Sequence, residues 1–387
     1  MKKYVTLGEV CRINMGQSPD SSTYNKNGEG IPFYQGNADF GEMYPITRHW
    51  CTIPTKVVEK GDILVSVRAP IGALNIATEH CCIGRGLAAI TVNSDMVSRN
   101  YIWYLLKSKV SMLQSLGTGS TFKAINKNVL NELCFQLSSL TEQDKISMTL
   151  KKVDLIIRNC TEILGGLDLL IKSQFVEMFG DPIDNPNGWN VKPLKELSSL
   201  ITNGNTPKGG SENYIDNGVT FLRSQNIWRN KIDLSDVVYI DEITHRKMQK
   251  SSVRYKDILI TKTGRVNTEN SSLGRAALFL GKDGTANING HVYLVRLNNS
   301  VVPEYVVTIL TGEAYRKYIR KVCVGGIDKR QINLDQVEDF PIILPPIEQQ
   351  NQFADFVKTI DKSKLAVKKT LEKAETLKKT LMQEYFG

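Results

Sequence analysis

A stretch of about 40 residues occurs twice in this chain, and its spacing of apolar side chains constrains the fold more than any other feature. In residues 140–180 apolar positions recur at alternating steps of four and three, and residues 347–387 repeat the pattern. Phe353 lies 207 residues after Ile146, and the two stretches also end 207 residues apart, so no insertion separates the copies. This spacing is typical of a coiled-coil seam. The sequence therefore predicts two helices of equal length, each about 60 Å long.

The predicted seam is apolar in both copies, with a few exceptions. It comprises Ile146, Leu150, Val153, Ile157, Leu164, Leu167 and Ile171 in the first copy and Phe353, Val357, Ile360, Val367, Leu371 and Leu381 in the second. Lys364 and Lys378 interrupt the second series, and Gly165 and Gly166 lie within the first helix. Because each helical glycine costs about 1 kcal/mol relative to alanine, we expect a kink or a close helix crossing there. The seams are buried if the two helices pack antiparallel, or if each meets another chain.

The segments between the helices repeat as well. The letters GQSP at 16–19 are matched by GNTP at 204–207, and GDIL at 61–64 is matched by KDIL at 256–259. The second motif of each pair leads into a predicted buried strand. Residues 181–189 are dense in Asp, Asn, Pro and Gly, which predicts a linker between the repeats.

We therefore predict an α+β fold of two mixed α/β domains in tandem repeat, each followed by a long helix, with the helices pairing as an antiparallel coiled coil. The predicted boundaries are 1–139 for the first domain, 140–180 for the central helix, 181–189 for the linker, 190–346 for the second domain and 347–387 for the C-terminal helix. A short amphipathic opening is predicted at 5–16, with Leu7, Val10 and Ile13 on one face. The domains differ by an insertion at 229–250, whereas the helices keep their length. The helices are thus predicted to fix a distance between two different recognition surfaces.

Composition narrows the class of partner. Lys and Arg number 49 against 40 Asp and Glu, and the resulting charge of +9 suits a polyanionic partner without proving one. Seven scattered cysteines without a CxxC motif favour reduced thiols rather than a disulfide framework or a zinc site. We find no signal peptide and no apolar run long enough to cross a bilayer. We therefore expect a cytoplasmic protein that does not bind membranes.

Motifs for catalysis are missing from the sequence. There is no P-loop, no glycine-rich dinucleotide turn and no Asn/Asp-Pro-Pro-aromatic motif of the amino-methyltransferases. The four histidines, His49, His80, His245 and His291, are far apart in the sequence. We predict that the chain has no active site and no metal site.

Residues suited to DNA recognition do occur at matching places in both repeats. Base reading needs polar side chains that reach the major groove, and phosphate binding needs Lys, Arg and small residues. The candidates are Gln17, Ser18, Gln35, Asn37, Arg68, Arg85, Thr118, Ser120, Thr121 and Lys123 in the first repeat, and Asn205, Thr206, Lys208, Arg223, Gln225, Asn226, Arg229, Lys262, Arg265, Asn289, His291, Lys329 and Arg330 in the second. Any one of them alone is more typical of a solvated loop residue, so the prediction rests on the matching positions in the two repeats. Trp228 is interpreted as a partly buried core residue rather than a stacking side chain.

The ordered set of repeated motifs resembles the specificity subunit of type I restriction–modification systems, over essentially the whole chain. Besides the paired motifs above, the resemblance rests on LPPIEQQ at 344–350 and on FGDP at 179–182 followed by NGW at 187–189. The first copy departs from it, because SSLTEQ at 138–143 replaces the Pro-Pro form. The resemblance implies two target-recognition domains joined by antiparallel spacer helices and a bipartite, asymmetric double-stranded DNA target with an unread gap.

The resemblance also implies partners. Two methyltransferase subunits are expected to dock on the helical region, with ATP-dependent restriction subunits, two where present, attached through them. No cofactor is expected on this chain, since S-adenosylmethionine, ATP and Mg belong to the partner subunits. The alternatives are a methyltransferase or nuclease with an unrecognised active site, and a coiled-coil scaffold whose domains bind protein. Methylation by the chain alone would favour the first alternative, and binding that ignores salt would favour the second.

Overall fold

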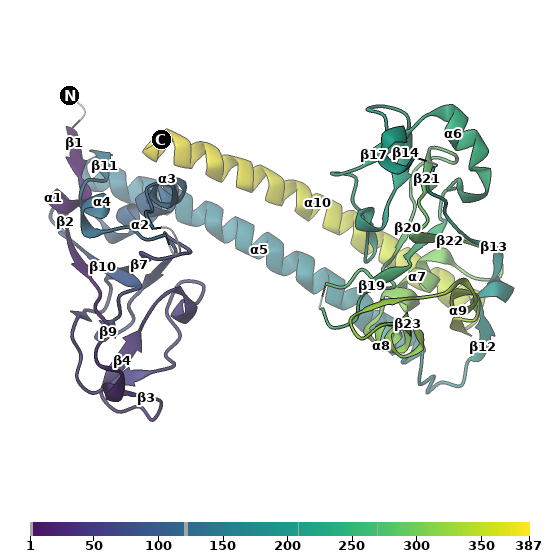
Figure 1. The fold of residues 1–387 in the computed structure, drawn as a ribbon, viewed down its shortest axis with the longest axis horizontal. Coiled ribbons are helices and arrows are strands. Elements are labelled where there is room, and N and C mark those ends of the chain that lie inside the picture. Colours follow the sequence, from purple (N-terminus) through teal and green to yellow (C-terminus); the bar gives the residue numbers. More distant parts are fainter. Residues whose placement is uncertain (1–2, 120–122, 208, 269) are drawn as a thin grey trace. The chain divides into compact units, whose positions relative to one another are not determined.

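The computed structural model describes all residues except 1–2, 120–122, 208 and 269, and it divides into two compact units (Figure 1). Unit 1 comprises Met1–Thr161 and Lys368–Gly387, and unit 2 comprises Glu162–Val367. Each unit thus combines one of the predicted domains with part of each long helix. The compact units therefore end within the helices rather than at the predicted domain–helix boundaries.

A four-stranded antiparallel sheet is the centre of unit 1, in the order β2-β10-β7-β8 (Figure 1). Its strands are β2 (Cys11–Met15), β7 (Ile63–Ser66), β8 (Leu74–Ile76) and β10 (Leu87–Val92). Ile63 and Val65 face a core shared with helix α2 (Arg99–Ser108), whereas Leu64 faces a smaller core with Tyr34. Strand β7 is buried on both faces, which explains why it reads as the apolar run Ile-Leu-Val rather than as an alternating pattern.

The smaller core of unit 1 lies under a second sheet, in the order β3-β5-β4-β9-β6. Its strands are β3 (Tyr24–Asn25), β4 (Ile31–Tyr34), β5 (Trp50–Cys51), β6 (Val57–Val58) and β9 (Cys81–Ile83). Strands β4 and β9 pair parallel, so their carboxyl ends meet at the same edge. The remaining elements of the domain are β1 (Lys3–Thr6), α1 (Leu7–Val10), α3 (Val110–Ser115), α4 (Lys127–Asn131) and β11 (Cys134–Leu137).

Unit 2 repeats this plan. Its central sheet has the order β13-β22-β18-β20, and its parallel pair is β14–β21. The strands are β12 (Asn190–Pro193), β13 (Ser198–Asn203), β14 (Val219–Leu222), β15 (Ile227–Trp228), β16 (Lys231–Ile232), β17 (Val238–Ile240), β18 (Ile258–Thr261), β19 (Thr263–Arg265), β20 (Ala276–Leu278), β21 (Ala286–Ile288), β22 (Val292–Leu297), β23 (Val324–Gly325), β24 (Lys329–Gln331) and β25 (Pro341–Leu344). The helices before the last are α6 (Glu242–Lys247), α7 (Pro303–Thr311), α8 (Glu313–Val322) and α9 (Leu334–Glu338). The predicted tandem repeat of mixed α/β domains is confirmed.

The long helices are α5 (Leu140–Phe179) and α10 (Ile347–Phe386), each within one residue of its predicted range. In unit 1, Lys378 of α10 forms an ion pair with Asp154 of α5 at 2.7 Å. In unit 2, Lys364 of α10 forms an ion pair with Asp168 of α5 at 2.6 Å. The two pairs are 14 residues apart on each helix and run in opposite directions, so the helices pair antiparallel as predicted. The two lysines that interrupt the apolar series are therefore bonded across the seam, whose other residues are buried or half-buried.

The last aromatic residue of each long helix is buried in a domain core. Phe179 packs against Tyr305 in unit 2, with ring centroids 5.0 Å apart. Phe386, the equivalent residue of the second copy, packs against Tyr101 in unit 1 at 5.1 Å. The C-terminus of the chain therefore completes the core of the unit that holds the N-terminal domain, which explains why both copies end in Phe-Gly.

A buried glutamine anchors the start of each long helix. The Gln143 side chain accepts from the backbone N–H of Ser98 at 2.8 Å and donates to the carbonyl of Met96 at 3.0 Å. Gln350, at the equivalent position, accepts from the backbone N–H of Val302 at 3.0 Å. Since buried polar groups need hydrogen-bond partners, this residue fixes the helix to its own domain. The glutamine at this position is thus explained in both copies, although Glu142 precedes it in the first and Gln349 in the second, and the first copy lacks the two prolines.

One sequence-based expectation is wrong, namely the close helix crossing expected at the glycines of the first long helix. Gly165 and Gly166 lie in an uninterrupted helix, and a Cβ atom at either position would meet nothing within 4 Å, so they mark no close crossing. The opening segment 5–16 is helical only over four residues of α1 and then continues as strand β2. Within the described residues, no helix combines the length and the apolar character that a membrane span requires.

Candidate nucleic-acid interface

A basic cavity of about 690 Å³ opens in unit 1 where loops follow β4, β7 and β9. Four of the predicted DNA-binding residues line it together, namely Gln35, Asn37, Arg68 and Arg85. Arg48, His49 and Tyr24 also line it and were not predicted. The parallel pairing of β4 and β9 brings Gln35 and Arg85 to the same edge of the sheet. The cavity therefore presents three arginines beside amide groups, a combination suited to phosphates and base edges.

Backbone hydrogen bonds hold the loops of the basic cavity. Asp39 is buried and accepts from the backbone N–H of Gln35 at 2.7 Å, which fixes the loop after β4. The backbone N–H of Arg85 donates to the Ser18 hydroxyl at 3.3 Å, so the GQSP loop supports the loop after β9. The rings of Tyr24 and Phe33 are 4.6 Å apart in the wall of the cavity. Ser18 thus supports the site, while Arg48, Arg68 and Arg85 line the cavity as exposed residues.

The glycine that opens this loop motif is required in both repeats. A Cβ atom on Gly16 would lie 2.1 Å from the carbonyl oxygen of Gly84, and one on Gly204 would lie 2.2 Å from that of Ile288. These contacts are too short for any side chain, so only glycine allows the backbones to approach. Gln17, Asn205 and Thr206 follow these glycines and are exposed.

In each repeat, a basic segment that follows the buried strand of the GDIL or KDIL motif pairs with a segment that precedes an Ile-Asn dipeptide, at 125–126 and 332–333. In unit 1, Arg68 and Thr118 both bridge to Ala124, and Lys123 beside it is exposed. In unit 2 the same segments form the sheet β19-β24-β23, where Arg265 pairs with Lys329. Ser120, Thr121 and Lys208 lie outside the described residues.

Unit 2 has two adjoining concave surfaces. One, of about 490 Å³, is lined by Arg265, Lys329 and Arg275, and the other, of about 470 Å³, by Arg275, Trp228 and Arg229. Trp228 is 41% exposed, and its ring covers the Arg275 guanidinium at 3.8 Å, so its interpretation as a core residue is wrong. Burial, with a smaller contribution from Arg229, lowers the pKa of Arg275.

Asn226 is not available for DNA and was wrongly included among the candidates. Its side chain is 1% exposed, accepts from the backbone N–H of Arg223 at 2.9 Å and donates to the carbonyl of Asp236 at 2.9 Å. It occupies the place that Asp39 holds in unit 1 and supports the loop. Arg223 donates to Asp236 at 3.3 Å, and Gln225 donates to the same carboxylate. These two predicted residues are therefore hydrogen-bonded to Asp236, which belongs to the insertion at 229–250.

The remaining predicted residues of unit 2 do not join these two surfaces. Asn289 accepts from the backbone N–H of His291 at 3.1 Å, and this turn follows β21 as Arg85 follows β9. The Lys262 ammonium lies 5.7 Å from the centre of the Tyr293 ring. Arg330 donates to the carbonyl of Gly326 at 3.2 Å.

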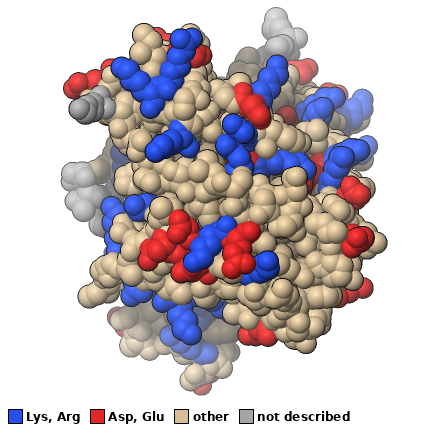
Figure 2. Space-filling model, turned by 90° about the vertical axis from the view of Figure 1, so that its right-hand side faces the viewer, with Lys and Arg blue, Asp and Glu red and all other residues tan. Residues whose placement is uncertain are grey.

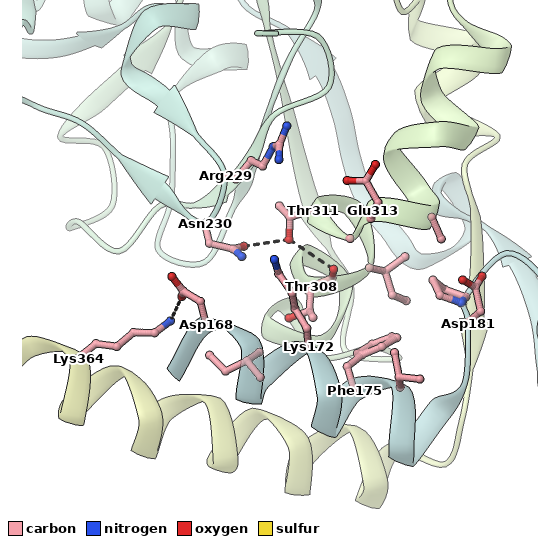
Figure 3. A pocket seen from close by; sticks show the side chains of 16 residues that line it. Asp168, Lys172, Phe175, Asp181, Arg229, Asn230, Thr308, Thr311, Glu313 and Lys364 are labelled. Atoms are coloured by element: carbon pink, nitrogen blue, oxygen red, sulfur yellow. Dashed lines mark hydrogen bonds and ion pairs between the residues drawn. The ribbon is translucent and has the colours of Figure 1, made fainter. Parts of the chain in front are cut away.

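A third cavity of unit 2, of about 400 Å³, lies where α5 meets α7 and α8 (Figure 3). Lys172 and Phe175 of α5 line one wall, and the hydroxyl of Thr311 donates to the side-chain oxygen of Asn230 at 3.2 Å (Figure 3). Among the predicted DNA-binding residues only Arg229 lines this cavity. It is therefore a feature of the helix–domain junction rather than of the loop surface.

Charge alone does not identify the interface. On the face of unit 2 shown in Figure 2, Lys and Arg side chains lie among Asp and Glu side chains rather than in one block.

Burial raises the pKa of the Cys81 thiol to about 12, so this cysteine is protonated at neutral pH. Among the residues that the structure describes, no cluster of His, Cys, Asp and Glu side chains is placed to hold a metal ion.

Sequence comparison identifies the family. The family model described as the Type I restriction modification DNA specificity domain matches residues 2–166 and again residues 186–376. The chain is 26% identical over 391 residues to the type I restriction enzyme MjaIX specificity subunit of Methanocaldococcus jannaschii, covering 93% of this chain and 86% of that protein. It is 47% identical over 155 residues to the MjaX specificity subunit of the same organism, a match that covers 40% of this chain and 36% of that protein.

Structural comparison agrees on the fold. The type I restriction–modification S subunit from M. genitalium is similar over 100% of this chain and 96% of that one, with a TM-score of 0.62 and 15% identity. Both matches of the family model fall on the repeated domains, and together they cover most of the sequence. The chain therefore belongs to the specificity-subunit family of type I restriction–modification systems, whose members supply DNA recognition rather than catalysis.

Proposed function

We propose that this chain recognises a bipartite, asymmetric DNA target, with one half read by each unit, and that it brings methyltransferase subunits, and restriction subunits where present, to that target. The observation that carries the proposal is one scaffold occurring twice with different loops. Both units contain the same central sheet and the same parallel strand pair. Because the side chains at equivalent loop positions differ, the two units are expected to read different sequences.

The two units differ in the loop that follows the first strand of the parallel pair, which is β4 in unit 1 and β14 in unit 2. In unit 1 Gln35 borders an open cavity together with Arg68 and Arg85. In unit 2 the equivalent Arg223 is held by Asp236, and the basic side chains gather instead around Arg265. One half of the target is thus expected to meet a basic cavity and the other a projecting β-ribbon. We expect no cofactor on this chain, with S-adenosylmethionine, ATP and Mg on the partner subunits.

The test is to purify the chain with an adenine methyltransferase and to map the methylated sites, then to exchange residues 190–346 for another second domain. We expect one bipartite motif, of which only one half changes after the exchange. Simultaneous change of both halves would refute the division of labour. Methylation by the chain alone would instead support an unrecognised active site, and binding that does not weaken with salt would support a protein scaffold.

We infer that the methyltransferase partner docks on the outer face of α5, because the seam residues are already used in pairing. Large apolar residues remain exposed there in two rows of heptad spacing. One row holds Ile156, Ile163 and Leu170, and the other holds Met148, Leu155, Leu169 and Val176 and is interrupted by Glu162. The equivalent positions of α10 are mostly polar, for example Ser363 and Thr370. Exposed apolar patches of this kind are typical of protein interfaces.

We expect Ile163→Glu to abolish copurification with the methyltransferase, because the interface would have to bury a carboxylate. Leu365→Glu on α10 is the matched control, since Leu365 is isolated and similarly exposed, at 55% against 49% for Ile163. Circular dichroism of both variants checks that the helices persist. Equal copurification of the two variants would contradict docking on α5.

A further inference from the structure

One isoleucine of unit 2 is almost completely exposed. Ile327 is 90% exposed and lies at the tip of the hairpin formed by β23 and β24. Single exposed apolar residues are common on protein surfaces, but they usually keep part of the side chain covered. Here a branched apolar side chain projects from a ribbon whose neighbours are glycine, aspartate and lysine. Its position therefore needs an explanation beyond folding of this chain.

The hairpin tip is held in place by neighbouring residues. The backbone N–H of Gly326 donates to the carbonyl of Lys329 at 3.2 Å, and the Arg330 guanidinium donates to the carbonyl of Gly326 at 3.2 Å. On the other side, the backbone N–H of Val266 donates to the carbonyl of Asp328 at 2.9 Å, and Arg265 pairs with the Asp328 carboxylate at 3.3 Å. Ile327 is thus presented by a braced turn.

A tight backbone approach supports the same turn. Gly325 has a φ of 132°, and a Cβ atom there would lie 2.9 Å from the carbonyl oxygen of Lys329. Any other residue at this position would open the ribbon, so the narrow tip depends on glycine. A narrow two-stranded ribbon with a side chain at its end has dimensions that a DNA groove accepts.

Basic side chains flank the exposed isoleucine. Lys329 is exposed, the Arg265 side chain is 69% exposed, and both line the same concave surface. Phosphates on either side of a groove would meet these charges when the tip enters it. Asp328 next to Ile327 is ion-paired with Arg265, so the apolar side chain lies beside one ion pair and the cation of Lys329. An acidic protein surface would leave the isoleucine against water, whereas stacked bases next to phosphates offer an apolar contact for the isoleucine and a charge for Lys329.

We propose that Ile327 inserts as an apolar wedge between neighbouring base pairs in the half of the target bound by unit 2, and that Lys329 and Arg265 bind the flanking phosphates. The inference rests on the proposed function. Apolar side chains that partly unstack a base step bend the duplex, so recognition by unit 2 then depends on how easily that step deforms.

The experiment uses the full chain with its methyltransferase and target duplexes that carry 2-aminopurine at successive positions of that half. The wild-type complex is expected to raise fluorescence at one step, where stacking is lost. Ile327→Ala is expected to abolish the rise and to weaken binding about tenfold, as for loss of one well-placed apolar contact, without changing the salt dependence. Ile327→Met is expected to keep the rise, because it retains the apolar volume.

Lys329→Ala is the matched control from the same hairpin. It is expected to reduce the slope of log affinity against log salt by about one while the fluorescence rise persists. If the wild-type complex binds its target and Ile327→Ala shows the same fluorescence and the same affinity as the wild type, the wedge is refuted and the proposed function stands. A wild-type complex that fails to bind any methylatable duplex would overturn the proposed function and the wedge together.

Discussion

Removing residues 155–161 from α5 together with 371–377 from α10 is expected to shorten the unread gap of the DNA target while recognition of both halves persists. The two segments face each other in the antiparallel pair, because Asp154 bonds Lys378 directly beside them. The ion pairs Asp154–Lys378 and Asp168–Lys364 are kept in the double deletion, and so is the heptad register. Seven residues correspond to about 10 Å of helix, or about three base pairs of 3.4 Å.

The observed shortening is expected to be at most about three base pairs. Each base pair also turns the next half of the target by roughly 35° around the duplex. Removing one heptad scarcely rotates one end of the helix pair relative to the other. The two halves of a target shortened by about three base pairs would therefore face different directions around the duplex, which opposes a shortening of three full base pairs. Mapping methylated sites for the double deletion measures the new gap, and an unchanged gap would contradict the role of the helices as spacers.

Either deletion alone is the matched control. It leaves one helix seven residues longer than its partner, so Asp154–Lys378 and Asp168–Lys364 cannot both form. The helix register that is correct for one unit would then be shifted by seven residues in the other unit, which would lose its ion pair between α5 and α10. We expect each single deletion to reduce methylation far more than the double deletion does, although the double variant lacks twice as many residues.

The long helices were predictable because their pattern leaves few alternatives. An apolar repeat of 3.5 residues over this length cannot form a strand or an isolated surface helix, and the exact duplication set both ends. What the sequence could not show is why Lys364 and Lys378 interrupt the seam. Their acidic partners, Asp168 and Asp154, lie about 200 residues away in the chain, and only the antiparallel register brings them together.

The opening of each domain was harder to predict. Leu7, Val10 and Ile13 have helical spacing, yet only the first two belong to α1, while Ile13 belongs to a strand paired with β10. A spacing of three fits both a helix and a turn that leads into a strand. Here sheet pairing with a distant segment decided the conformation, and such pairing leaves no local signal.

The candidate site was partly predictable. Residues found at matching places in both repeats, such as Arg68 and Arg265, do lie at the corresponding edges of their sheets. Arg48 and Arg275 were missed because they have no partner in the other repeat that would mark them. Asn226 was included because its residue type suits base reading, whereas its actual role depends on which backbone groups surround it.

Phe386→Ala is expected to destabilise unit 1 by about 3–5 kcal/mol, although it changes the second residue from the C-terminus. Terminal residues are usually poorly ordered and tolerant of change. Phe386 is instead buried in the core of unit 1, where its ring meets Tyr101, and its backbone carbonyl accepts from the Lys109 ammonium. Losing the ring leaves a cavity that two domain helices and the end of α10 cannot close without moving.

Phe179→Ala is the matched variant, because it removes the equivalent ring from unit 2, where it packs on Tyr305. Hydrogen exchange resolves the two effects. We expect faster exchange of the amides of α2 in Phe386→Ala and of α7 in Phe179→Ala, with the other unit unaffected in each case. Protection lost equally from both units would show that the C-terminus does not belong to the core of unit 1. Local loss, by contrast, would mean that truncating a few terminal residues unfolds the domain at the opposite end of the sequence.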